Sequence, residues 1–340
     1  MTDSTAPPWA ALVDALRADS PIAILEAAER RLKGVLQQQL ARPLGGDQIR
    51  SLAAFQQDLG FLLKYKSYAV KAASPLGYSV FLQRPGEGFS FQQHVTHKTE
   101  IFYILDVLPG GFVFLCDFDD WKRIYDRESF LAWMNGAADA RYERFRFVPQ
   151  PGDVIVIDRL SVVHSVVGCV LAEFATVSTD MVDRLHDQNE GRSIPAEFTR
   201  AFSESRIRSL EWPERSRLVT LEPSGWSRTD VPSRQIQGGQ QTDFGNDPRF
   251  SASAFRIEPG AHSATSTISD RATCLHVATG SGQLILGTQE ELRRASPPAL
   301  NAKAGDLFLI APDAHYVIVN DTHQPLVVAR HEIPPDVAFI

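Results

Sequence analysis

An internal repeat decides the architecture of this chain more than any other property of its sequence. Residues 82–105 match residues 254–279, and GDVIVIDRLSVVHSVV (152–167) resembles GDLFLIAPDAHYVIVN (305–320). Both copies consist of short runs rich in Val, Ile, Phe and Tyr that are separated by Gly and Pro, which is typical of a β-sandwich or barrel. Because repeated sequence indicates repeated structure, we predict a mainly β fold with two tandem β-barrels.

The segments around the repeat divide the chain into parts. Residues 1–74 carry apolar residues at helical spacing and are predicted to be a helical N-terminal region. The first barrel is expected over 75–185 and is interrupted at 117–141 by an acidic, helical insertion. Residues 186–248 are polar and low in strand signal, which indicates a crossover with one helix. The second barrel is expected over 249–340.

The candidate chemistry lies in the first copy. His94, His97 and Glu100 fall within seven residues, and His164 follows some distance later in an apolar run. Imidazoles combined with a carboxylate suit a first-row transition metal. Side chains of a strand alternate between its faces, so the odd step from His94 to His97 requires a bulge or turn for both to point inward. Without one, only His94 and Glu100 bind from this segment.

The second copy lacks this group of residues. In the ungapped match, His94, His97 and Glu100 fall opposite Ile268, Arg271 and Cys274, which together make a poor metal site. The histidine comparable to His164 is His315, and it stands two residues short of the matching position. We therefore expect one divalent metal ion per chain, in the first barrel.

These motifs resemble those of the cupin superfamily, and the duplication resembles a bicupin. The residues that match the first cupin motif are Gly88, His94, His97, Glu100 and Gly110, and those that match the second are Pro151, Gly152, Asp153 and His164. The resemblance covers about residues 75–185 well and 250–335 more loosely. It departs from the usual pattern in one place, since the histidine pair is HxxH rather than HxH. The runs 97–105 and 176–192 are also similar to sugar-phosphate isomerase cupins.

The resemblance implies a metal-dependent function, and three alternatives stay open. The first is a non-haem iron oxygenase acting on a small metabolite, with Fe(II) favoured and Mn, Ni, Zn or Cu as other choices. The second is a metal-dependent sugar isomerase or epimerase, for which Glu87 and Asp158 are candidate bases. Tyr103 is a further candidate site residue that would line the pocket. The third is a non-catalytic ligand-binding bicupin. Residues 117–123 of the insertion are a candidate lid over the first barrel.

Composition excludes several other classes of protein. The net charge of −7 argues against a nucleic-acid-binding surface. No apolar run approaches the ~20 residues that span a bilayer, and the N-terminus lacks the pattern of a signal peptide. The three cysteines are widely spaced and odd in number, which indicates reduced thiols. We expect a cytoplasmic protein with a small-molecule substrate, and by the resemblance to bicupins a homodimer is plausible.

Overall fold

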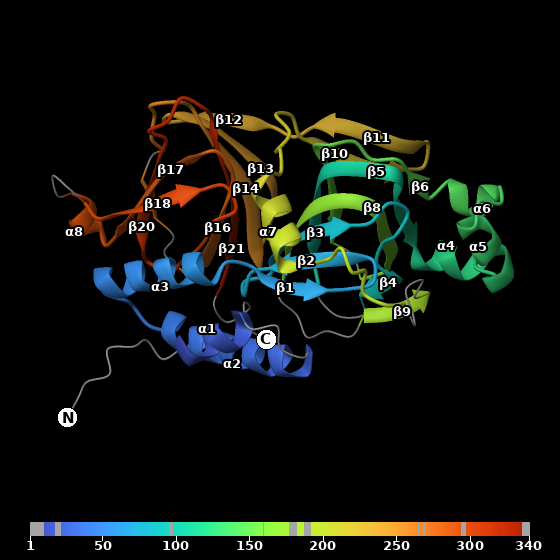
Figure 1. The fold of residues 1–340 in the computed structure, drawn as a ribbon. Coiled ribbons are helices and arrows are strands. Elements are labelled where there is room, and N and C mark those ends of the chain that lie inside the picture. The colour runs from blue at the N-terminus through green and yellow to red at the C-terminus, as the bar shows by residue number, and fades with distance from the viewer. Residues whose placement is uncertain are drawn as a thin grey trace.

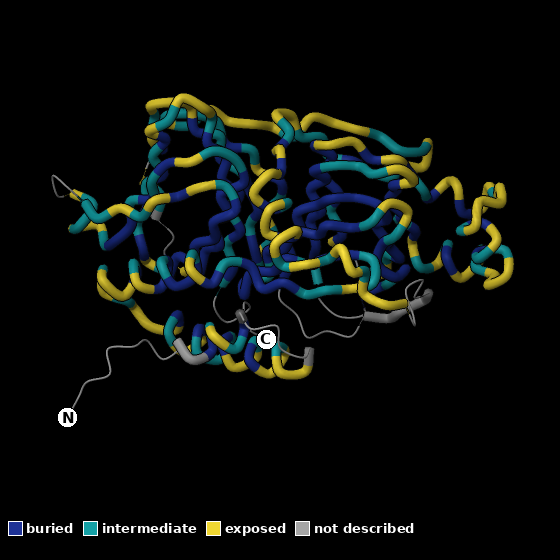
Figure 2. Tube along the Cα trace, viewed as in Figure 1, coloured by how far each residue is buried: buried dark blue, intermediate teal, exposed yellow. Residues whose placement is uncertain are grey.

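The computed structural model describes residues 10–17, 22–94, 98–158, 160–176, 182–186, 192–263, 265–267, 270–293 and 297–334. Their strands form two β-units that stand side by side, with N-terminal helices beneath them (Figure 1). Buried residues concentrate in the strands of both units, whereas exposed residues lie on helices, turns and outer hairpins (Figure 2). The mainly β fold with two tandem units agrees with the prediction from the repeat.

The N-terminal region begins with three helices, α1 (Ala10–Arg17), α2 (Ile22–Leu40) and α3 (Gly46–Leu59). Helical structure ends earlier than predicted, because Gly60 takes a φ of 65° and closes α3, a conformation that glycine adopts without a Cβ clash. The residues that follow form a hairpin of β1 (Leu62–Tyr65) and β2 (Ala69–Ala73). Among the described residues, no helix has the length and apolar character needed to cross a membrane.

The first β-unit brings distant segments of the chain together. Its central strands follow the order β3-β8-β5-β7, and β4 pairs with β8. The long strand β5 pairs with β8 on both sides of a register shift between Val107 and Phe112, where the sheet bends. The strands are β3 (Tyr78–Gln83), β4 (Phe91–His94), β5 (Glu100–Asp117), β6 (Arg146–Phe147), β7 (Asp153–Ile157), β8 (Val162–Ala175) and β9 (Val182–His186).

The second β-unit repeats this order as β14-β21-β16-β19. A smaller sheet, β15-β20-β17-β18, completes it, so that β16 with β17 and β20 with β21 correspond to the two long strands of the first unit. The elements are β14 (Phe250–Ile257), β15 (Ser266–Thr267), β16 (Ala272–Thr279), β17 (Ser281–Gly287), α8 (Gln289–Leu292), β18 (Ala299–Lys303), β19 (Leu307–Ile310), β20 (His315–Val319) and β21 (Leu326–Ile333).

The segment expected to be a crossover holds one helix, α7 (Arg200–Arg208), and four strands that we did not predict. Two of them, β10 (Arg217–Glu222) and β11 (Gly225–Asp230), extend the first sheet, and β12 (Ser233–Ile236) and β13 (Gly239–Asp247) extend the second. The outer strands β11 and β12 are mostly exposed or half-buried. Because these residues are polar, the sequence shows no alternation of apolar and polar residues that would predict a strand. The strands form through backbone hydrogen bonds with their neighbours.

The two units pack through the outer face of the first sheet. Tyr103 stacks on Phe244 at 4.6 Å between ring centroids and lies 5.0 Å from the ring of Trp212. The hydroxyl of Tyr78 lies 2.7 Å from Nδ1 of His276 in the same buried layer. This layer fixes which faces of β3, β5 and β8 point away from the interior of the first barrel.

The insertion between β5 and β6 is helical, as predicted, with α4 (Phe118–Ile124), α5 (Arg127–Met134) and α6 (Ala140–Glu143). Its aromatic side chains pack around Phe91, which meets Phe130 at 4.8 Å in a T-shaped contact. Phe91 and Gln92 are neighbours on β4 and so point to opposite faces. Since Gln92 contacts His164, the insertion covers the outside of the barrel wall, and the idea of a lid over the interior is wrong in this arrangement.

Candidate metal centre

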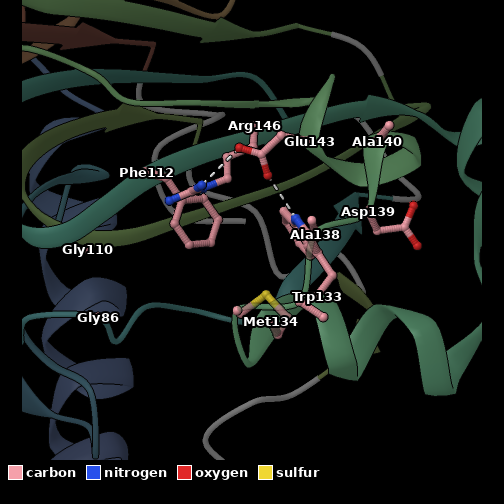
Figure 3. A pocket seen from close by; sticks show the side chains of 12 residues that line it. Gly86, Gly110, Phe112, Trp133, Met134, Ala138, Asp139, Ala140, Glu143 and Arg146 are labelled. Atoms are coloured by element: carbon pink, nitrogen blue, oxygen red, sulfur yellow. Dashed lines mark hydrogen bonds and ion pairs between the residues drawn. The ribbon is translucent and has the colours of Figure 1, made fainter.

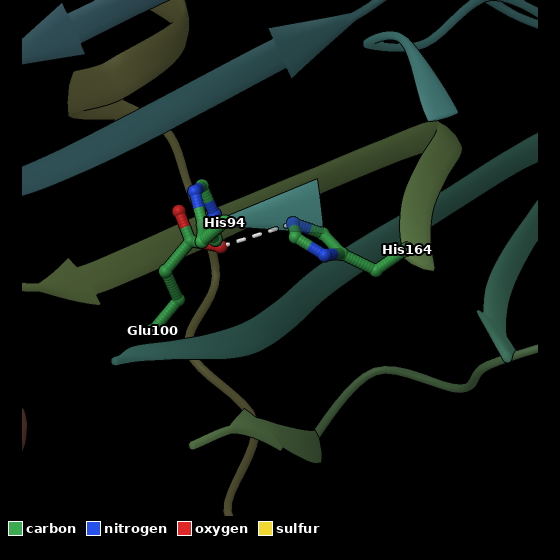
Figure 4. A group of neighbouring side chains, drawn as sticks. All are labelled: His94, Glu100 and His164. Atoms are coloured by element: carbon green, nitrogen blue, oxygen red, sulfur yellow. Dashed lines mark hydrogen bonds and ion pairs between the residues drawn. The ribbon is translucent and has the colours of Figure 1, made fainter. Parts of the chain in front are cut away.

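Three residues predicted as metal ligands meet inside the first barrel. His94 ends β4, Glu100 begins β5 and His164 lies near the start of β8, and all three are buried (Figure 4). Nε2 of His94 lies 2.9 Å and Nε2 of His164 lies 3.1 Å from the same carboxylate oxygen, Oε2 of Glu100. Phe89 and Phe102 border the ring of His164, with centroids 6.2 and 6.1 Å away. The group therefore sits against an apolar wall that keeps water out.

The contacts of His164 place its Nε2 between the carboxylate of Glu100 and the side-chain amide of Gln92. Its Nδ1 lies 3.3 Å from the carbonyl oxygen of Val162, which can only accept, so Nδ1 carries the proton. In the neutral ring Nε2 is then an acceptor, and it faces the carboxylate of Glu100. A proton or a metal cation held between this nitrogen and the carboxylate would satisfy both acceptors.

Burial and charge act in opposite directions on these groups. Burial lowers the pKa of His164 and favours its neutral ring, although the contact with Glu100 partly opposes this. Burial would raise the pKa of Glu100, but the charge of Lys98 and the contacts with both imidazoles outweigh it and hold that pKa well below the ordinary value. A neutral imidazole and an ionised carboxylate are the states that bind a metal.

The donor set fits a divalent transition metal. Ligand atoms of the three residues lie within 4.8 Å of one another, and two nitrogens and one oxygen suit iron, manganese, nickel or zinc. Bonds of about 2.1 Å to such a metal place adjacent ligand atoms roughly 3 Å apart, close to the two spacings around Oε2. Among the described residues, the buried Nδ1 of His94 has no hydrogen-bond partner, so this ring has a second nitrogen that could coordinate.

Sequence reasoning missed one residue of this group, Gln92. Its Nε2 lies 3.3 Å from Nε2 of His164, and its backbone pairs directly with that residue. Gln92 and His94 are separated by an even step on β4, so both point inward. A rotation of the amide would turn its oxygen toward the other donors. The inward pair is therefore Gln92 with His94, and the alternation rule applied to glutamine would have found it.

Comparisons with known proteins give fold-level similarity. No protein-family model and no curated protein matches the chain. Among solved structures, it is similar to oxalate decarboxylase from Bacillus subtilis (12% identity, 81% of this chain and 74% of that chain, TM-score 0.48). Mannose 6-phosphate isomerase from Bacillus subtilis (16%, 75% and 74%, 0.48) and vicilin from Corylus avellana, hazelnut (13%, 82% and 84%, 0.45), are also similar.

The duplicated strand order decides the fold. β3-β8-β5-β7 in the first unit and β14-β21-β16-β19 in the second are the same arrangement. The fold is a tandem pair of cupin-type β-units, in agreement with the fold expected from the two motifs. The Gly-Asp turns of both motifs are alike: Gly152 and Gly305 take φ of 92° and 87°.

The other predicted site residues of this chain lie elsewhere. His97 falls outside the described residues, so its part in the group stays a prediction. Tyr103 points away from the metal group, because it alternates with Phe102 on β5 and packs between the two units. Glu87 lies in a turn, paired with Arg84 at 3.2 Å. Its carbonyl accepts from the N–H of Gly168, four residues and so about 13 Å along β8 from His164. Neither Tyr103 nor Glu87 reaches the group.

Two lysines and a second carboxylate lie beside the group. Nζ of Lys98 is 2.5 Å from Oε1 of Glu100 and 4.0 Å from Oε1 of Glu173. Nζ of Lys71 is 2.7 Å from Oε2 of Glu173 and lies over the ring of Phe81. Charged groups that can hold or move a proton therefore flank the candidate metal ligands.

One cavity of the molecule lies away from the candidate metal ligands. A cavity of about 660 Å³ lies between the insertion and the end of the first barrel, and none of the three ligands lines it (Figure 3). Trp133, Glu143 and Arg146 line it, and Glu143 binds both the indole N–H of Trp133 and the guanidinium of Arg146 at 3.0 Å. This cavity is therefore separate from the candidate metal ligands.

The second barrel has lost the ligands, but not at the positions that the ungapped match gave. Glu100 pairs with Ile157 and Thr273 with Ile310, each four residues after the aspartate of the Gly-Asp turn, so Thr273 replaces Glu100. By the same register Tyr316, opposite Ser266, replaces His164, opposite Gln92. The match to Cys274 is wrong by one residue, because the second barrel is one residue shorter between its first turn and β16.

Proposed function

We propose that this protein is a mononuclear metal-dependent enzyme whose active site lies in the first barrel. The observation that carries the proposal is the convergence of two buried imidazole nitrogens on one oxygen of Glu100, at 2.9 and 3.1 Å. A divalent cation between them would be held by one ligand atom from each of the three residues.

For the reaction class, we propose a non-haem iron oxygenase. Two histidines and one carboxylate are the protein ligands of many Fe(II) oxygenases and leave positions open for substrate and O2. When bound, iron would supply the redox chemistry. The chain itself would hold His164 by Val162 and exclude water with Phe89 and Phe102.

A second candidate, a metal-dependent isomerase or epimerase, is favoured by Lys98 and Glu173. Such a reaction moves a proton next to a polarised carbonyl, and it needs an acid or base within reach of the metal. Lys98 touches the candidate ligand Glu100 and lies 4.0 Å from Glu173. Lys98 and Glu173 could exchange a proton with a substrate, whereas an oxygenase does not need this pair.

Metal content and a nitric oxide probe test the proposal and separate the candidates. The metal in wild type, His164→Ala and the control His315→Ala is measured by inductively coupled plasma mass spectrometry. We expect about one metal ion per chain in wild type and control, and nearly none in His164→Ala. No metal in wild type, even after reconstitution, would leave a non-catalytic binding protein.

The anaerobic protein is then loaded with Fe(II) and treated with nitric oxide, and its electron paramagnetic resonance spectrum is recorded. An S = 3/2 iron nitrosyl signal shows an open position for a diatomic ligand and supports the oxygenase. Binding of Zn or Mn in preference to iron, with no nitrosyl signal, favours the isomerase.

A further inference from the structure

Four charged side chains form a continuous chain in the first barrel. Lys71 contacts Glu173 at 2.7 Å, Glu173 lies 4.0 Å from Lys98, and Lys98 contacts Glu100 at 2.5 Å. The carboxylates are almost completely buried, at 5% and 1% side-chain exposure, whereas Lys71 and Lys98 keep 26% and 18%. Each buried carboxylate therefore has a partly exposed lysine beside it.

The sheet register shows that this chain of charges belongs to the barrel interior. Glu173 pairs with Phe102 across β5 and β8, and Lys71 pairs with Phe81 across β2 and β3. Phe81 and Phe102 are part of the apolar core inside the first barrel. Cross-strand partners point to the same face, so both charged residues face the interior that holds Glu100.

The four charges balance only while no metal is bound. Two lysines and two glutamates sum to zero, so each buried carboxylate has a cation beside it. A divalent metal held by neutral histidines raises the sum to +2. Uncompensated charge in a poorly solvated site is costly, and an anion that enters from solvent is the simplest compensation.

The second barrel provides an internal comparison. At the position of Glu173 it carries Arg330, since both pair with a serine on the next strand, Ser79 and Ser253. Arg330 pairs with Glu332 at 3.2 Å, and Thr273 stands where the first barrel has Glu100. The charge of Arg330 is therefore balanced by the neighbouring carboxylate of Glu332. The open chain of lysines and glutamates thus occurs in the barrel that has the candidate metal ligands.

We propose that the metal-loaded first barrel binds its substrate through an anionic group, a carboxylate or phosphate, paired with the ammonium of Lys98. This inference rests on the proposed function, because the excess positive charge exists only when metal is bound. Lys98 is the contact residue, since it is the cation nearest the ligands and its partner Glu100 is then shared with the metal. Lys71 stays paired with Glu173 and keeps that carboxylate from repelling the anion.

The test uses full-length protein loaded with Co(II), whose visible absorption reports changes at the metal. Acetate, inorganic phosphate and uncharged acetamide are titrated separately at constant ionic strength, and the cobalt content of every sample is measured. We expect acetate or phosphate, whichever matches the substrate, to shift the spectrum saturably and acetamide to leave it unchanged. Lys98→Met should raise the apparent Kd for the anion at least tenfold, whereas Lys98→Arg should retain most of the anion binding.

Lys122→Met, on the insertion helix α4, is the matched control and should bind like wild type. An equal response to acetamide, or equal anion affinity in Lys98→Met and wild type at full cobalt content, would overturn the inference while leaving the metal site intact. Absence of stoichiometric cobalt in wild type would overturn the proposed function and this inference together. The cobalt measurement therefore tells the two failures apart.

Discussion

Glu100 and Thr273 occupy the same position in the two barrels of this chain, each paired with an isoleucine four residues after the aspartate of a Gly-Asp turn. Glu100 is contacted by two imidazoles and a lysine. The hydroxyl of Thr273 is buried and has no hydrogen-bond partner within the part of the chain that the structure describes. The same position of the duplicated fold thus carries a carboxylate with several ionic contacts in the first barrel and an uncharged hydroxyl in the second.

This relationship predicts one metal site per chain, with Glu100 as its anionic ligand. Glu100→Gln should reduce bound metal from about one per chain to near zero, because the site loses its only described carboxylate ligand. Thr273→Ala should leave the metal content unchanged. Mass spectrometry of both proteins after reconstitution provides the measurement, and retention of metal by Glu100→Gln would refute the assignment.

Gln92 is predicted to be a fourth ligand. Gln92→Ala should weaken metal affinity by about 10-fold or more, the range seen even for residues that only support a ligand. The neighbouring Gln93 points to the opposite face and donates to the carbonyl of Leu160, so Gln93→Ala is the matched control and should keep wild-type affinity. Competition with a chromogenic chelator measures both, and equal affinities would remove Gln92 from the site.

Local patterns in the sequence predict the repeat, the motif residues and the separation of the two barrels. They do not predict the pairing register of the strands. One residue fewer before β16 shifts the whole strand, and a shift of one residue exchanges its faces, which is why Cys274 was matched in place of Thr273. Contacts across long sequence separations were also missed, because nothing near Lys71 in the sequence indicates that it meets Glu173.

Asp153 of the second motif is predicted to be structural rather than a ligand. It is fully buried and holds Arg217 at 3.4 Å and Arg228 at 3.1 Å, which ties β7 to β10 and β11. Asp153→Asn leaves these arginines without their anion and should lower the free energy of unfolding by about 3 kcal/mol. Urea unfolding measures this loss, while the metal content of the folded protein should stay at the wild-type value. Loss of metal from folded Asp153→Asn would contradict the assignment.

The histidines between the barrels predict loss of stability in mild acid. Burial lowers the pKa of His276 to about 3 and that of His331 to about 4, from 6.5 for an unburied ring. Between these values the unfolded chain binds protons that the folded chain does not. Their stabilising effect is therefore complete above pH 6.5 and is lost as the pH falls toward 3 to 4.

Each such histidine contributes a slope of about 1.4 kcal/mol per pH unit in this window. Other groups add to the total, including His164, whose pKa is also lowered by burial. A difference between variants isolates one histidine: His276→Leu should be less steep than wild type by about 1.4 kcal/mol per unit between pH 6 and pH 4.5. Urea unfolding at several pH values measures both slopes. Parallel curves would mean that His276 accepts a proton in the folded protein, and that the layer between the barrels opens to water.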